Sequence, residues 1–273
     1  MNRVFRLFVF LSPILLTACG TGLYKVPTEE YRKEVKTLGV LPLLVDGNST
    51  ILHPQRDEII AMLQRASAGR ETRLVELLRK NKNYFDVRAV AAEPVSLASR
   101  LIKGSTLVTN RNQVSRQYQL DPQVLAELAR SSVVDGLLIV ILNGVEQEEK
   151  RWDRTPPDYL ESRYNNILAT AMVVNPAGKV FWEYPGTAGS AFLNLQYAAF
   201  DEAHFNKTEA VKVYFLSPEG VNRTLSEPDR SLFGQSDFPS LYRQTFEKLA
   251  GALATGLNEV LSRQLAKPAA TTK

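Results

Sequence analysis

The run from Val133 to Leu142 constrains the fold more than any other part of the chain, because eight of its ten residues are aliphatic. A strand this apolar, and this rich in β-branched residues, is typical of the centre of a sheet that is covered on both faces. The mostly apolar residues 36–44 predict a second strand, the first ordered element of the domain, and the alternating residues 84–90 predict a third. We therefore expect helices to cover the sheet.

Periodicity and turn residues predict the other elements. A helical stretch over 55–81 is interrupted near Gly69, and Asp121 with Pro122 forms a good start for a second helix. The remaining predictions are strands over 166–174 and 179–184, joined by the turn Asn175–Gly178, and a final helix over 239–265. The order β-α-β-α-β-β-β-α indicates an α/β fold with a mixed β-sheet flanked by helices.

Two segments stand apart from this pattern. Residues 103–119 are polar, and we expect them to be irregular. Residues 187–235 form an insertion that is too long for a plain loop in a compact domain. Within it, the alternating runs 193–199 and 211–215 predict an extra hairpin.

The first nineteen residues have the pattern of a bacterial export signal. Arg3 and Arg6 precede an apolar run that is too short to span a bilayer as a helix. The run ends in Leu16-Thr17-Ala18-Cys19-Gly20, which resembles the cleavage box of bacterial lipoproteins. The resemblance implies that the mature chain begins at Cys19, the only cysteine, with acyl chains on its sulfur and amino group that anchor it stably.

The expected organisation follows from this box. Position 20 is Gly and not the Asp associated with retention in the inner membrane, which favours the periplasmic face of the outer membrane. The expected parts are a signal peptide (1–18), the acylated cysteine with a short tether (19–35), a periplasmic α/β domain (36–266) and a disordered tail (267–273).

Composition argues against several function classes. The formal net charge of the 273 residues is +4, and removal of residues 1–18 reduces it to +2, so no nucleic-acid partner is expected. One cysteine and two histidines, His53 and His204, cannot form a zinc site, and we expect both histidines on exposed loops. Phosphate-binding and hydrolase motifs are lacking, so we expect no metal, cofactor, catalytic residue or enzymatic activity.

Several motifs occur together in one known family. Leu120-Asp121-Pro122, then Val134-Asp135-Gly136, and the hairpin Ala171–Trp182 resemble the periplasmic α/β domain of a group of envelope proteins. The group comprises the curli-secretion channel lipoprotein, the outer-membrane lipoprotein activators of penicillin-binding proteins, and the amino-terminal domain of the Tol-system propeller protein. The resemblance covers roughly residues 36–186 and the last helix. It implies a non-catalytic lipoprotein that binds another envelope protein or assembles with itself.

The insertion is the best candidate for an interaction surface, because loops on a rigid scaffold often carry specificity. Its aromatic residues could form a protein-binding hot spot or could cover the domain's own sheet edge. The candidate residues are Phe192, Tyr197, Phe200, Tyr214, Phe215 and Phe233. Glu146, Glu148 and Glu149 precede several basic residues, which indicates a solvated charge run at the end of a strand.

Two alternative functions remain open at this point. A subunit of a curli-channel-like secretion pore would need transmembrane strands of about 9–11 residues, and the runs 193–199 and 211–215 are shorter. An activator of peptidoglycan synthesis would need a long arm, and the sixteen residues from Gly20 to Val35 are short for that purpose. We therefore favour a membrane-anchored periplasmic lipoprotein that binds or assembles with envelope proteins.

Overall fold

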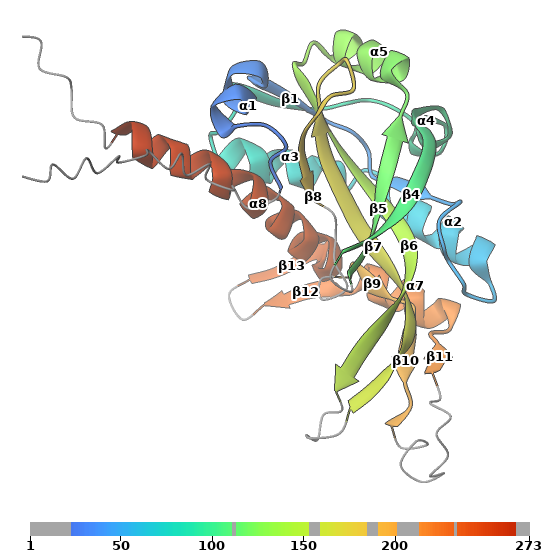
Figure 1. The fold of residues 1–273 in the computed structure, drawn as a ribbon. Coiled ribbons are helices and arrows are strands. Elements are labelled where there is room, and N and C mark those ends of the chain that lie inside the picture. Colours follow the sequence, from blue (N-terminus) through green and yellow to red (C-terminus); the bar gives the residue numbers. More distant parts are fainter. Residues whose placement is uncertain are drawn as a thin grey trace, which may run out of the picture.

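A computed structural model describes residues 23–110, 113–152, 159–184, 191–200, 213–231 and 234–265 (Figure 1). The predicted α/β fold is confirmed: a mixed sheet lies between two layers of helices. In the described ranges, the main sheet has seven strands, five of them in the order β3-β1-β6-β7-β8. They are β1 (Thr37–Val40), β2 (Leu44–Asp46), β3 (Asp86–Ala89), β6 (Gly136–Trp152), β7 (Tyr159–Val174), β8 (Val180–Tyr184) and β9 (Leu193–Asn194).

Strand β6 is the centre of the sheet, as its apolar sequence predicted. It pairs in parallel with β1 and, further along, with β2, and in antiparallel fashion with β7. The crossover from β1 to the parallel strand β3 contains α2 (Arg56–Ser67) and α3 (Glu71–Lys80). The predicted interruption of the helical stretch near Gly69 is confirmed: Gly69 lies between the two helices with a φ of +72°, a conformation that glycine adopts without strain.

Alternating residues of β6 enter two separate cores, because successive strand side chains point to opposite faces. Leu138, Val140 and Leu142 lie in the core that includes residues of α2, α3 and the final helix. Leu137, Ile139 and Ile141 lie in the core on the other face. The first face is covered by α1 (Thr28–Glu34), α2, α3, α7 (Pro218–Ser226) and α8 (Ser240–Leu265), and the second by α4 (Pro94–Leu101) and α5 (Pro122–Ser132).

The folded body begins earlier than we expected. Instead of serving as a free tether, the chain from Leu23 onward packs on the edge of the sheet, where the amide of Glu183 donates to the carbonyl of Leu23. Helix α1 follows, and its Tyr31 is fully buried. This helix has only seven residues and one of them, Tyr31, is buried, so it is too short to recognise by periodicity. Residues 19–22 lie outside the described part.

The prediction of an irregular segment over 103–119 was wrong. These residues form the antiparallel hairpin of β4 (Ile102–Asn110) and β5 (Gln113–Leu120). Ile102, Tyr118 and Leu120 of this hairpin pack on the core, but Arg116 interrupts the apolar alternation by which a half-buried strand is recognised. A buried arginine, Arg116, donates to Ser105 within the hairpin and attaches the hairpin to the body by donating to Thr50.

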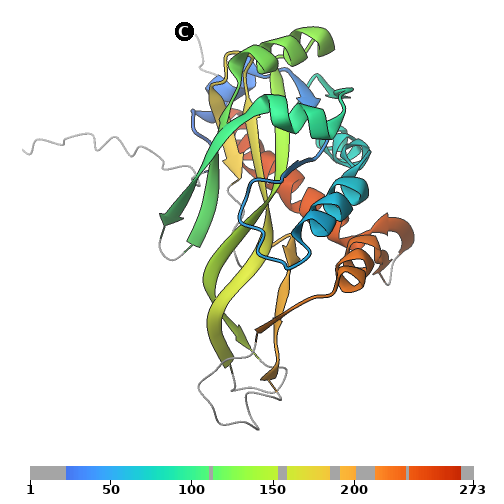
Figure 2. The same ribbon diagram turned by 90° about the vertical axis from the view of Figure 1, so that its right-hand side faces the viewer.

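The hairpin of β6 and β7 is also longer than predicted. Their antiparallel pairing continues from Leu137 and Val174 to Trp152 and Tyr159, beyond the apolar core. We call residues 146–152 and 159–165 the distal ribbon. It reaches the end of the molecule opposite α1 and α5 (Figures 1 and 2).

The insertion contributes several strands and a helix, and its buried residues belong to the core on the α2–α3 face of the sheet. Strand β9 pairs with β7, and the predicted extra hairpin is confirmed as β10 (Gln196–Ala198) paired with β11 (Val213–Phe215). Helix α7 follows, and β12 (Pro228–Ser231) with β13 (Gly234–Pro239) forms another hairpin before α8. No helix in the described ranges is both long and apolar enough to cross a bilayer.

A candidate interaction site at the distal end of the sheet

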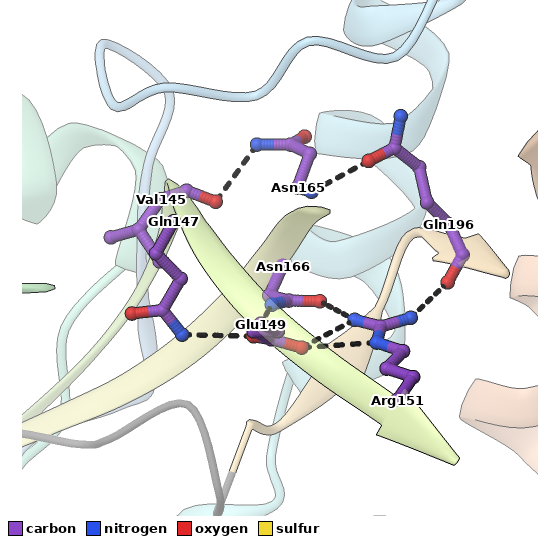
Figure 3. Close-up of polar contacts among 7 residues, drawn as sticks. All are labelled: Val145, Gln147, Glu149, Arg151, Asn165, Asn166 and Gln196. Carbon is purple, nitrogen blue, oxygen red and sulfur yellow. Dashed lines mark hydrogen bonds and ion pairs between the residues drawn. The ribbon is translucent and has the colours of Figure 1, made fainter. Parts of the chain in front are cut away.

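The distal ribbon is stiffened by an ion pair that our sequence analysis assigned to solvent. Glu149 and Arg151 lie two residues apart on β6, so both side chains lie on the same face of the strand. The guanidinium donates to one carboxylate oxygen from Nε at 3.0 Å and from Nη2 at 2.8 Å (Figure 3). Both side chains are less than a fifth exposed. The expectation of a solvated charge run was therefore wrong at Glu149.

The same two residues connect the ribbon to the insertion. Arg151 donates to the main-chain carbonyl of Gln196 at 2.5 Å and to the side-chain oxygen of Asn166 at 2.9 Å. The amide of Asn166 donates in turn to Glu149, and so does the amide of Gln147, at 2.8 Å. Together these contacts fix β10 against the edge of β7 (Figure 3).

Gln196 and Asn165 provide the second attachment of the insertion. The side-chain oxygen of Gln196 accepts the backbone N–H of Asn165 at 2.7 Å, and the backbone N–H of Leu195 donates to the Asn165 carbonyl at 3.1 Å. The amide of Asn165 also donates to the carbonyls of Thr50 and Val145. Because these polar groups have partners, their burial costs little and the arrangement is specific.

Beyond this network, two aromatic rings project from the end of the ribbon. Trp152 and Tyr159 are directly opposite each other in the β6–β7 register, with ring centroids 5.2 Å apart. The ammonium group of Lys150 lies 3.4 Å from the Tyr159 centroid. The Trp152 side chain is nevertheless 60% exposed, and that of Tyr159 is 47% exposed.

The β10–β11 hairpin contributes a second aromatic pair. Tyr197 and Tyr214 are opposite each other in register, with ring centroids 6.0 Å apart, and both are among the exposed large side chains of the molecule. The ends of both hairpins lie at the same end of the molecule in two perpendicular views (Figures 1 and 2). We call Trp152, Tyr159, Tyr197 and Tyr214 the distal aromatic tip.

The structure divides the six predicted surface residues between two roles. The prediction of Phe192 as a surface residue was wrong, because its side chain is buried against Tyr242 with the ring centroids 5.1 Å apart. Phe215 packs against His53 at 5.2 Å and is half-buried, as is Phe200. Tyr197 and Tyr214 are exposed, whereas Phe233 and the predicted lipidation residue Cys19 lie outside the described residues. The insertion therefore both covers the body and presents aromatic side chains.

Trp152 and Tyr159 were not among the predicted surface residues. Their signal in the sequence is an aromatic residue on each side of the charged segment 153–158, with Lys150 and Glu161 two positions further away. This signal becomes recognisable only when the register places the two rings opposite each other.

His53 is not the exposed loop residue that we expected, because it is buried. Its Nδ1 accepts the backbone N–H of Gln55 at 2.9 Å, so its Nε2 donates to the carbonyl of Leu216 at 2.8 Å. The Nδ1 contact fixes the imidazole within the β2–α2 loop, and the Nε2 contact holds the insertion to that loop. His204 lies outside the described residues, among which no group of three His, Cys, Asp or Glu residues could hold a metal ion.

No protein-family model and no curated protein matches the sequence.

Proposed function

We propose that this chain is a lipid-anchored, non-catalytic protein of the bacterial cell envelope that binds a protein partner through the distal aromatic tip. The observation that carries the proposal is the exposure of four aromatic side chains at one end of the molecule. Tyrosine and tryptophan are enriched in protein-binding hot spots, because they bury a large area and lose little side-chain entropy. The resemblance of Leu16–Gly20 to a lipoprotein cleavage box supports lipid anchoring at Cys19, and Gly at position 20 supports the periplasmic face of the outer membrane.

The polar network beneath the tip supports this role. A binding surface that is already ordered loses less conformational entropy on association than a mobile one. Arg151 and Gln196 join the hairpin that carries Trp152 to the hairpin that carries Tyr197. The two aromatic pairs can therefore contact a partner as one surface.

The length of β6 separates this surface from the rest of the body. Its 17 residues, at a rise of about 3.4 Å per residue, extend for roughly 55 Å. A site at the far end of such a strand can reach a partner away from the body of its own domain. The partner can be another envelope protein or a second copy of this chain, and the experiment below distinguishes the two.

The binding proposal is tested by affinity capture of the tagged, acylated protein from crosslinked envelopes. The double variant Trp152→Ala/Tyr197→Ala is expected to recover about tenfold less partner, since loss of hot-spot aromatics commonly costs that much affinity or more. Leu107→Ala is the matched control, because Leu107 is an exposed apolar residue on the β4–β5 hairpin. Co-expression of a second, differently tagged copy identifies self-assembly. Equal recovery with the double variant and the control would refute the proposal.

The anchor is tested separately with Cys19→Ser. Without the thiol the chain cannot be acylated at this position, so we expect the protein to leave the detergent-soluble membrane fraction. Mass spectrometry of the amino-terminal peptide of the unaltered protein should show Cys19 with its acyl chains. An unmodified Cys19, or a variant that stays on the membrane, would contradict lipid anchoring.

A further inference from the structure

A second exposed apolar surface lies at the end of the sheet opposite the distal aromatic tip. Here β1, β3 and β6 begin, and a cleft of about 650 Å³ opens between them and α5. We call it the proximal cleft. The residues that define its surface are Lys36, Phe85, Arg88, Arg130, Val133 and Pro176.

Two apolar side chains stand out from this cleft. Phe85 is 89% exposed and Val133 is 70% exposed. Val133 ends α5 with a φ of +53°, in the left-handed conformation that β-branched residues rarely adopt. A large exposed phenyl group and an exposed branched residue in a strained conformation are poorly explained by the packing of the domain itself.

The polar residues around the cleft leave an excess of positive charge. Lys36 and Arg130 are exposed, and neither forms an ion pair with another residue in the described ranges. The two carboxylates nearby already accept hydrogen bonds from other groups of the protein. Asp86 accepts from Arg88 at 2.6 Å, and Asp135 accepts the backbone N–H groups of Lys36 and Thr37. The proximal cleft thus presents apolar groups inside a cationic rim.

The amino-terminal end of the folded body limits the distance between this surface and the anchor. Leu23 pairs with β8, and only four peptide units separate it from Cys19, a span of at most about 14 Å. From Leu23 the chain continues through α1 directly to Lys36 at the cleft. Helices α1 and α5 lie at the same end of the molecule, opposite the distal ribbon (Figure 1).

We propose that the proximal cleft is a membrane-contacting surface, on which Phe85 and Val133 enter the headgroup region while Lys36 and Arg130 bind anionic lipid phosphates. The proposal rests on the lipid anchor of the proposed function. Apolar side chains flanked by basic residues are the chemistry that binds a protein to the surface of an anionic bilayer. With this end on the leaflet, β6 directs the distal aromatic tip away from the membrane.

The test uses the acylated full-length protein in vesicles of phosphatidylethanolamine and phosphatidylglycerol. The introduced cysteine of Phe85→Cys is labelled with an environment-sensitive dye, while acylation of Cys19 leaves no other thiol in the chain. We expect the emission at position 85 to rise about twofold on insertion into the apolar boundary and to be quenched by spin-labelled lipids. The same label in Tyr197→Cys, at the opposite end, should show neither effect.

A second variant tests the charge contribution. Lys36→Gln/Arg130→Gln in the labelled Phe85→Cys background should reduce quenching by about half, because headgroup attraction adds to apolar insertion. The same reduction should follow from raising the salt concentration to about 1 M, at which the screening length is near 3 Å.

The outcomes separate the two proposals. If the protein floats with the vesicles but the label at position 85 is not quenched, the anchor holds and the membrane-contacting surface is refuted. If the protein does not float with the vesicles, both the lipid anchor and the membrane-contacting surface are refuted. If position 85 is unquenched by lipid but crosslinks to a protein in native envelopes, the cleft binds a protein and the lipid assignment is overturned.

Discussion

Arg151 donates two hydrogen bonds to a single carboxylate oxygen of Glu149, and the two residues lie on the same strand with their side chains mostly buried. This pair lies where two long strands leave the apolar core and continue as a polar ribbon. It provides the ribbon with the internal contacts that apolar packing provides elsewhere, and it connects the ribbon to the insertion through Gln196.

Removing the cation should loosen the distal end. Arg151→Met leaves the carboxylate of Glu149 without its main partner, and we expect the free energy of unfolding to fall by about 2 kcal/mol. Urea unfolding measures the loss, and faster hydrogen exchange at Leu195, whose N–H donates to Asn165, locates it. The matched control is Arg163→Met. Arg163 is an exposed side chain that pairs with Glu146 at 3.5 Å, so its loss should lower the free energy of unfolding by less than about 1 kcal/mol. Equal losses in the two variants would contradict the account of the network.

Gly144 should not tolerate a side chain. Its backbone N–H donates to the hydroxyl of Ser49 at 2.8 Å, and its carbonyl accepts the backbone N–H of Thr50 at 3.1 Å. The loop after β2 therefore lies directly on β6. A Cβ at this position would overlap the Thr50 carbonyl and lie 2.6 Å from Ile51 Cγ1. We expect Gly144→Ala to cost about 2–3 kcal/mol in chemical denaturation. Gly251→Ala, on α8 with open space around its Cα, should instead be neutral or slightly stabilising.

Val133→Gly should raise stability. The residue has a φ of +53° and is mostly exposed, so glycine relieves backbone strain and loses little apolar burial. We expect a gain of about 1 kcal/mol and an increase in Tm of about 2–4 °C. Val133→Ala retains the Cβ and should gain less. A fall in Tm for the glycine variant would show that the side chain contributes packing that its exposure does not indicate.

The stabilising effect of Asp121 should depend on pH. The Lys103 ammonium at 2.8 Å, and then the backbone N–H of Gln123, lower the pKa of this carboxyl below its ordinary value of 3.8. A group whose folded-state pKa is lowered stabilises the protein above its unfolded pKa, and the effect is lost as the pH falls through the folded-state pKa.

Asp121→Asn should therefore melt below the unaltered protein at pH 7, and the difference should narrow as the pH falls below about 3.8. Thermal unfolding at pH 7 and near pH 3 measures this directly. Asp57→Asn is a control at a side chain that is 97% exposed, where little change is expected at either pH. A difference for Asp121→Asn that is equally large at both pH values would rule out the charge as its origin.

The buried part of the fold could be predicted from the sequence because burial leaves a pattern. Val133–Leu142 is apolar because both faces of β6 are covered. Asp121 caps the amino-terminal end of α5, and Gly178 has a positive φ in the turn between β7 and β8, so both residues match the local backbone. The β4–β5 hairpin and the distal ribbon could not be predicted, because polar residues such as Arg116 and Gln147 occupy buried positions of their strands and interrupt the apolar alternation.

Two of the four residues of the distal aromatic tip were predicted from the sequence. Tyr197 and Tyr214 were found because the insertion is rich in aromatic residues, but composition alone could not distinguish them from Phe192, which is buried. Trp152 and Tyr159 are seven positions apart in the sequence, and only the antiparallel register brings their rings together.

Site-specific photo-crosslinking in living cells tests whether the distal aromatic tip is the binding surface. A photoreactive residue at Tyr159 of the acylated protein is compared with one at Leu107, which has the same exposed fraction of 47%. Our account predicts a discrete protein adduct at position 159 that Trp152→Ala reduces about tenfold, and no such adduct at position 107. The absence of an adduct at position 159, or equal adducts at both positions, would contradict it.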